Sequence, residues 1–159
     1  MKLFKTNKTF HGGVHPSEYK ELSENCEFEI MPNPKQIIIP LSQHIGKPAK
    51  PLVGKKDQVK AGQVIAEQDG FISVPIHSPV SGTVKKISNE TNASGFPKES
   101  IIIDADESNE MELQPSLDPE KVTPEEIQER VKWAGIVGQG GAAFPDICEN
   151  HSAKRQKDR

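Results

Sequence analysis

The chain has 159 residues, of which 33% are hydrophobic and 27% charged, and its formal net charge is −3. This balance gives no general attraction for nucleic acid. The longest apolar stretch, residues 37–41, is far shorter than the roughly 18 to 20 residues of a membrane-spanning helix. The first 13 residues lack the apolar core of a secretory signal. The composition therefore predicts one domain or slightly more, with no spanning helix and no nucleic-acid partner.

Residues 1–34 combine polar side chains with turn formers such as Gly12-Gly13 and Pro32-Asn33-Pro34. Because proline fixes φ and removes a hydrogen-bond donor, this pattern predicts an irregular arm that wraps over a surface. Residues 17–22 are expected to form one helical turn, with Ser17 as its cap.

Residues 35–104 are predicted to be all β. Short apolar runs at 37–39, 63–66, 70–75, 82–87 and 100–103 are separated by Gly, Pro, Asn and Asp. Many short strands at this spacing favour a small barrel or sandwich over a parallel sheet. A turn at Ala61-Gly62, between Val59 and Val64, is expected to use a positive φ at the glycine.

An acidic stretch and a helix follow. Residues 104–129 contain ten acidic side chains and only Lys121 as a base, which we interpret as a solvated linker over residues 105–122. Thr123, Pro124 and Glu126 then form a capping-box pattern, which predicts a helix start. Gly135 is expected to end this helix in a left-handed conformation.

A glycine-rich sequence, residues 138–145, comes directly after the expected helix end. Dense glycines let backbone N–H groups approach an anion, and small alanines leave room for a flat ring beside Phe144. Taken alone, the pattern fits a structural turn as well as a phosphate or flavin cradle. It is not the dinucleotide-binding fingerprint, because no clear strand precedes it.

Cysteine and histidine give no metal site. Cys26 and Cys148 are far apart and form no CxxC pair, so nothing resembles a zinc ribbon. Four-thiolate iron–sulfur ligation within this chain is excluded, because it requires four cysteines and the chain has two. His11 and His15 are four residues apart, but the two glycines between them disfavour a helix. The two remaining histidines considered, His44 and His77, are expected to have structural hydrogen-bonding roles.

The β region resembles the barrel-sandwich hybrid of biotinyl and lipoyl carrier domains, through residues 53–66 and 78–84. Carrier domains present a modifiable lysine on the hairpin between these two motifs. Here the hairpin is Asp69-Gly70-Phe71, and residues 61–83 contain no lysine. Without an amine there is no amide linkage to biotin or lipoate, so the resemblance implies a rigid scaffold or docking surface.

The order of motifs along the chain resembles a second family. Phe10-His11-Gly12-Gly13-Val14-His15-Pro16 is followed by residues 40–53, 76–84 and 134–138, and then by the glycine loop. Together these look like the C subunit of the Rnf ion-translocating ferredoxin:NAD oxidoreductase. The resemblance extends from about residue 4 to residue 145.

This resemblance implies a peripheral subunit at the cytoplasmic face of the cell membrane, in which NAD(H) and FMN exchange hydride and single electrons pass through [4Fe-4S] clusters. Its partners are the other subunits of the electron transport complex. The family's flavin loop corresponds here to Gly138, Gly140, Gly141, Ala142, Ala143 and Phe144.

The family pattern ends at Phe144-Pro145, where a polar sequence replaces the expected continuation, and the cluster cysteines are absent. We therefore expect a truncated subunit that is inactive alone.

The predicted fold is mainly β: a barrel-sandwich hybrid with an irregular arm, a linker, one α-helix and the truncated start of a flavin-binding α/β domain. The expected parts are arm 1–34, hybrid domain 35–104, acidic linker 105–122, helix and glycine loop 123–148, and disordered tail 149–159. The alternative is a non-enzymatic docking or scaffold module.

Overall fold

The computed structural model describes residues 16–139 and 143–145, and the chain divides into two compact units between Pro32 and Asn33. In the described part of the first unit, a 3-10 helix, η1, occupies Lys20–Leu22. The residue before it is Tyr19, which has a φ of 53° and no side-chain capping bond. The expected Ser17 cap is therefore wrong, because the turn begins later and follows a left-handed residue.

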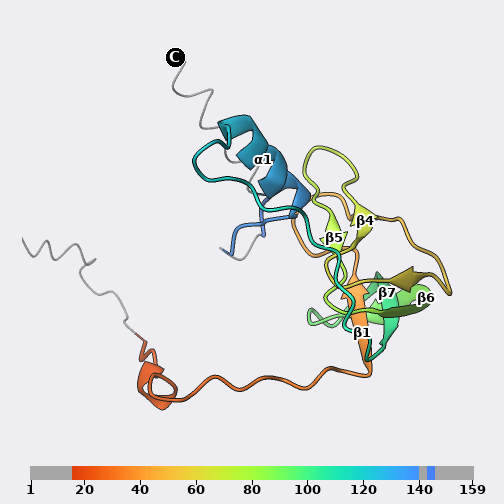
Figure 1. Ribbon diagram of the computed structural model, residues 1–159. Coiled ribbons are helices and arrows are strands. Elements are labelled where there is room, and N and C mark those ends of the chain that lie inside the picture. The colour runs from red at the N-terminus through yellow and green to blue at the C-terminus, as the bar shows by residue number, and fades with distance from the viewer. Residues whose placement is uncertain (1–15, 140–142, 146–159) are drawn as a thin grey trace, which may run out of the picture. The chain divides into compact units, whose positions relative to one another are not determined.

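The second unit is mainly β, as the sequence predicts (Figure 1). Its described residues form seven strands and one helix: β1 (Gln36–Pro40), β2 (Lys50–Pro51), β3 (Gln58–Val59), β4 (Val64–Glu67), β5 (Ile76–His77), β6 (Gly82–Thr91), β7 (Pro97–Ala105) and α1 (Pro124–Trp133). They build two antiparallel sheets, with strand orders β1-β7-β6-β3 and β2-β4-β5. We call these two sheets and their connections the β domain, residues 36–105.

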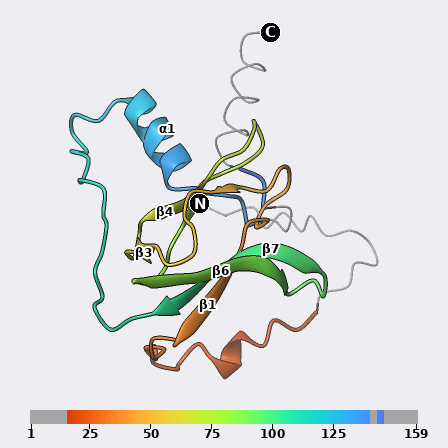
Figure 2. The ribbon, with the colours of Figure 1, turned by 90° about the vertical axis from the view of Figure 1, so that its right-hand side faces the viewer.

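Strand β7 lies at the centre of the hydrophobic core. Its residues Ile101, Ile102 and Ile103 are all buried, although consecutive side chains point to opposite faces of a strand. It pairs with β1 on one side and with β6 on the other, and Figure 2 shows these three strands together. A strand covered on both faces has continuous apolar residues rather than alternating ones, which explains the isoleucine run.

The expected strand at residues 70–75 is wrong. These residues form bends and irregular backbone, and the strand β5 begins only at Ile76. Two local causes are visible: Gly70 has a φ of 106°, and the Asp69 N–H donates to Ser73 Oγ at 3.0 Å, which closes a turn. Pro75 has no N–H to donate to a neighbouring strand.

The turn at Ala61-Gly62 has the expected positive φ, 87° at Gly62. However, it does not join a hairpin, because β3 pairs with β6 whereas β4 pairs with β2 and β5. The chain therefore passes from one sheet to the other at this turn. A Cβ added to Gly62 would lie 2.4 Å from the Glu112 carbonyl oxygen, so glycine is also required by close backbone packing.

The acidic segment after β7, which we call the strap (residues 106–122), is attached to the β domain over its first part. The Ala61 N–H donates to Glu110 O at 2.9 Å, and the Glu112 N–H donates to Ala61 O at 2.7 Å. Lys60 Nζ lies 3.0 Å from Glu110 Oε2. At the start of the strap, hydrogen bonds from Ser108 hold the pKa of Asp106 below its ordinary value. Lys60 thus balances one charge of the acidic segment, and hydroxyl groups stabilise the Asp106 carboxylate.

Helix α1 begins as its sequence predicts. Thr123 Oγ1 accepts from the Glu126 N–H, and the Thr123 N–H donates to Glu126 Oε2 at 2.8 Å, which completes the capping box. Gly135, with a φ of 67°, follows the last turn as the expected left-handed stop. The helix contains no fully buried residue, and Arg130 donates to Pro115 O of the strap at 2.9 Å.

Candidate functional site

The segment after α1 packs closely against the β domain. A Cβ added to Gly135 would lie 2.4 Å from the Pro75 carbonyl oxygen, so the two backbones are nearly in contact there. Glycine satisfies two requirements at this position: it adopts the positive φ that ends the helix, and it leaves room for the approaching carbonyl. The beginning of the glycine loop is therefore fixed relative to residue 75 of the β domain.

The glycine loop is closed at its base. Val137 forms a bridge with Pro145, and the Gly138 N–H donates to Phe144 O at 2.8 Å. Pro145 is fully buried and Phe144 is half-buried. Ala143 has a φ of 47°, in the left-handed region. Three of the six predicted site residues lie in this base, Gly138, Ala143 and Phe144; Gly140, Gly141 and Ala142 lie outside the described residues.

The Gly138 N–H has its hydrogen-bond partner in this base, so it is not available to an anion.

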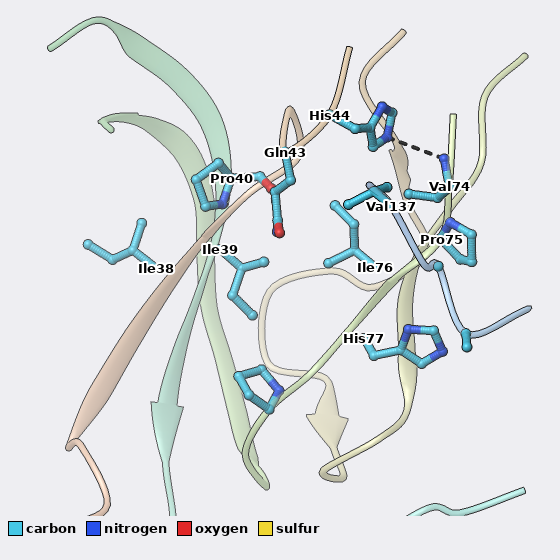
Figure 3. A pocket seen from close by; sticks show the side chains of 13 residues that line it. Ile38, Ile39, Pro40, Gln43, His44, Val74, Pro75, Ile76, His77 and Val137 are labelled. Atoms are coloured by element: carbon cyan, nitrogen blue, oxygen red, sulfur yellow. Dashed lines mark hydrogen bonds between the residues drawn. The ribbon is translucent and has the colours of Figure 1, made fainter. Parts of the chain in front are cut away.

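A groove of about 700 Å³ lies beside this segment. It is bordered by β1 and the loop after it, by residues 74–77 and Pro79, and by Ala134, Gly135 and Val137. Figure 3 shows that Ile38, Ile39 and Pro40 of β1 lie opposite Val74, Pro75, Ile76 and Val137. Sequence analysis did not predict this groove, because its walls come from three segments that are far apart along the chain.

His44 has a structural role at one end of the groove, as expected. Its Nδ1 lies 2.9 Å from Ile45 O, and its Nε2 accepts from the Val74 N–H at 3.2 Å (Figure 3). A carbonyl requires a donor and an N–H requires an acceptor, so these contacts assign the neutral form with its proton on Nδ1. Both nitrogens of the ring are occupied, which leaves neither for a ligand.

His77 differs from the expected hydrogen-bonded structural histidine. Its Nε2 is buried and has no hydrogen-bond partner. Instead, the ring lies edge to face with Trp133 of α1, with ring centroids 4.7 Å apart. The same side chain borders the groove and a second cavity of about 420 Å³ between α1, the strap and Gly62. His77 thus joins α1 to the β domain through ring packing.

We expect the stability of the protein to decrease with acidification because of His77. Burial lowers the pKa of His77 below its ordinary value of 6.5, so the folded chain binds fewer protons than the unfolded chain. Its contribution is therefore complete above pH 6.5 and is lost as the pH falls through the lowered pKa. The urea midpoint should decrease between about pH 7.5 and about pH 5.5.

The matched variant is His77→Phe, which keeps an aromatic ring against Trp133 but cannot take a proton. Its urea midpoint should change less over the same pH interval than that of the unmodified chain. An equal change in both proteins would contradict the role of His77.

The hairpin that carries lysine in carrier domains has a different composition here. Asp69 lies at this tip, and its Oδ2 forms an ion pair with Lys47 Nζ at 2.7 Å. Lys47 belongs to the neighbouring loop, whose Gly46 packs against the backbone of Ile72. The nearby ammonium is therefore ion-paired and does not lie on the hairpin itself.

Neither a metal centre nor a spanning helix is found in the described part of the chain. Residues 16–139 and 143–145 contain no group of three or more His, Cys, Asp or Glu side chains arranged to hold a metal. Cys26 is an exposed free thiol, while His11, His15 and Cys148 lie outside the described residues. Within the same residues, no helix is long and apolar enough to cross a bilayer.

Comparisons with known proteins identify relatives over most of the chain. A family model described as the RnfC barrel sandwich hybrid domain matches residues 8–108. The C subunit of the ion-translocating oxidoreductase complex of Rhodobacter capsulatus is 44% identical over 144 residues, which cover 89% of this chain and 28% of the relative.

Two further relatives differ in the ion that their names give. The C subunit of the Na⁺-translocating ferredoxin:NAD⁺ oxidoreductase complex of Acetobacterium woodii is 40% identical, over 86% of this chain and 31% of its own length. The proton-translocating counterpart of Clostridium ljungdahlii is also 40% identical, over 87% and 31%. The chain thus spans about three-tenths of the length of these relatives, and matches their N-terminal part.

Proposed function

Because this chain belongs to the family of the RnfC barrel sandwich hybrid domain, we propose that it acts as the N-terminal portion of a subunit in a membrane-bound electron transport complex. The proposed complex couples electron transfer between NAD(H) and ferredoxin to ion translocation. The similarity to the C subunits of three such complexes, over 86% to 89% of the chain, carries the proposal. The subunit would be peripheral, at the cytoplasmic face, and its partners would be the other subunits.

In this proposal the β domain is the scaffold and the glycine loop is the first part of a flavin site. Flavin supplies hydride acceptance and single-electron release when it is bound. The bond from the Gly138 N–H to Phe144 O closes the base of the loop. Gly140, Gly141 and Ala142, between these two residues, would supply the backbone donors, and Ala143 and Phe144 would border the ring. The two cysteines of the chain cannot ligate a [4Fe-4S] cluster, so clusters would require other parts of the subunit.

The test is a chimera in which residues 1–145 of this chain replace the matched part of the Rhodobacter capsulatus relative. The chimera should retain FMN and should reduce ferricyanide with NADH, whereas this chain alone should not oxidise NADH. In the chimera, Gly141→Glu places a carboxylate where an anionic cofactor would bind. We expect it to lower FMN affinity at least about tenfold, which corresponds to roughly 1.4 kcal/mol.

Ala93→Glu is the matched control, because it adds the same charge at an exposed turn between β6 and β7. It should leave the FMN content unchanged. Full flavin retention by Gly141→Glu would contradict the assignment of the loop. Flavin-dependent NADH oxidation by the isolated 159-residue chain would contradict the proposal that it supplies only a portion of the site.

A second candidate function is docking without electron transfer, and the lysine-free hairpin favours it. A carrier arm requires an amine at the tip, where this chain has Asp69 paired to Lys47. The β domain would then position partner subunits and have no redox role of its own. Wild-type electron transfer in a complex whose chimera carries Gly141→Glu would favour this function over the first.

A further inference from the structure

We propose that the groove beside the glycine loop binds the part of the subunit that follows the loop in the longer relatives. The groove would then be an internal interface of a complete subunit, and its occupant a folded body with an apolar contact surface. The inference rests on the proposed function only in assuming that the β domain and the part that follows the glycine loop belong to one complete subunit. It concerns packing and requires no electron transfer.

The chemistry of the groove favours an apolar occupant. Its border consists mostly of aliphatic side chains and prolines, including Ile39, Ile76 and Val137. Two of its polar side chains are bonded within the chain: His44 through both nitrogens, and Gln43 through Nε2, which donates to Pro40 O at 3.0 Å. The third, His77, has its unpartnered Nε2 buried. A phosphate or another charged ligand would therefore find few donors. An apolar surface would gain from burial of these side chains.

Exposed apolar side chains continue from the groove on both sides. Ile38 on β1 is 50% exposed, and Ile136, between the groove residues Gly135 and Val137, is 48% exposed. Strand β1 is also an edge strand of its sheet, with β7 as its one neighbour among the described strands. An isoleucine-rich edge strand that is left uncovered promotes association with other chains. The combination indicates a surface that is covered when the subunit is complete.

The path of the chain indicates which body covers it. The three relatives are matched over only 28% to 31% of their length, in their N-terminal part. Pro145, the last described residue of the glycine loop, forms a bridge with Val137, which itself borders the groove. A chain that continues beyond this position in the relatives therefore emerges beside the groove. The close packing of Gly135 against Pro75 fixes this exit point relative to the β domain.

The proposal is tested by cysteine labelling of the chimera and of the 159-residue chain. Cys26 is replaced by serine in both proteins, and Cys148 is replaced by serine in the 159-residue chain. Ile38→Cys should react readily with a maleimide in the 159-residue chain and at least about tenfold more slowly in the chimera, when followed by mass spectrometry of its peptide. Phe96→Cys is the matched control, because Phe96 is 69% exposed at the β6–β7 turn and does not border the groove. Its labelling rate should be equal in the two proteins.

Equal labelling of Ile38→Cys in both proteins would overturn the proposal. Protection that is already present in the 159-residue chain and increases with its concentration would assign the groove to a second copy, which also overturns it. If the chimera does not fold, the proposal is tested instead by co-purification of this chain with the separately expressed remainder of the relative. Recovery should fall with Ile38→Glu and not with Phe96→Glu, and no recovery with the unmodified chain would refute the interface. Because these measurements use no NADH or flavin, loss of redox activity would leave their outcome unchanged.

Discussion

Gly135→Ala should cause a large loss of stability and should detach the end of α1 from the β domain. The φ of 67° costs an L-residue roughly 1 to 2 kcal/mol, and the new Cβ would lie 2.4 Å from Pro75 O, so the backbone must move. We expect a total loss of about 2 to 4 kcal/mol in the free energy of unfolding. Trp133, the single tryptophan, contacts His77 next to this site. Its fluorescence should therefore change already without denaturant.

Gly95→Ala provides the matched control for this prediction. Gly95 has a similar φ, 80°, but a Cβ added there would have no atom within 4 Å. The control variant therefore has the conformational cost without the backbone clash. Its free energy of unfolding should decrease by only roughly 1 to 2 kcal/mol. It should leave the tryptophan spectrum unchanged. Equal losses of stability in the two variants, measured by urea unfolding, would refute the close approach at residue 135.

Ile103→Ala should strongly destabilise the core of the β domain. Ile103 is completely buried, and its neighbours across the sheet are Ile37 on β1 and Val84 on β6. Removing its side-chain atoms leaves a cavity between three strands, for which we expect a loss of about 2 to 5 kcal/mol. Urea unfolding followed by far-ultraviolet circular dichroism measures this loss.

The comparison variant is Ile38→Ala in the same sheet. Ile38 is half exposed, so its truncation should cost less than about 1 kcal/mol in the isolated chain. A loss comparable to that of Ile103→Ala would mean that the two isoleucines are equally buried in solution. This result would contradict the assignment of Ile38 to the outside of the β domain.

Sequence reasoning succeeded where local chemistry determines the structure. The capping box of Thr123 and Glu126, the left-handed Gly135 and the strand at the isoleucines of β7 each have a physical signature within a few residues. The barrel-sandwich hybrid fold was expected from the resemblance of residues 53–66 and 78–84 to carrier domains, and the matching family model confirms it. These features depend on short-range patterns, which a single sequence contains.

Sequence reasoning failed where tertiary packing determines the structure. The apolar residues 70–75 have the composition of a strand, but the bond from the Asp69 N–H to Ser73 Oγ turns the chain there. Strands β2, β3 and β5 are only two residues long, too short for any periodicity to be detected. The contact of His77 with Trp133 joins residues 56 positions apart. For the glycine loop, the described residues establish the closure of its base, while its role as a flavin site stays a prediction.

The pairing of β1 with β7 has a consequence for synthesis on the ribosome. Gln36 and Asp104 are partners across 68 positions of sequence. At a translation rate of roughly 5 to 20 residues per second, β7 is completed about 3 to 14 s after β1 has been made. During this interval the nascent isoleucines of β1 have no native neighbour. Molecular chaperones, or a slow local translation rate, would therefore have their greatest effect on this protein before residue 104 emerges.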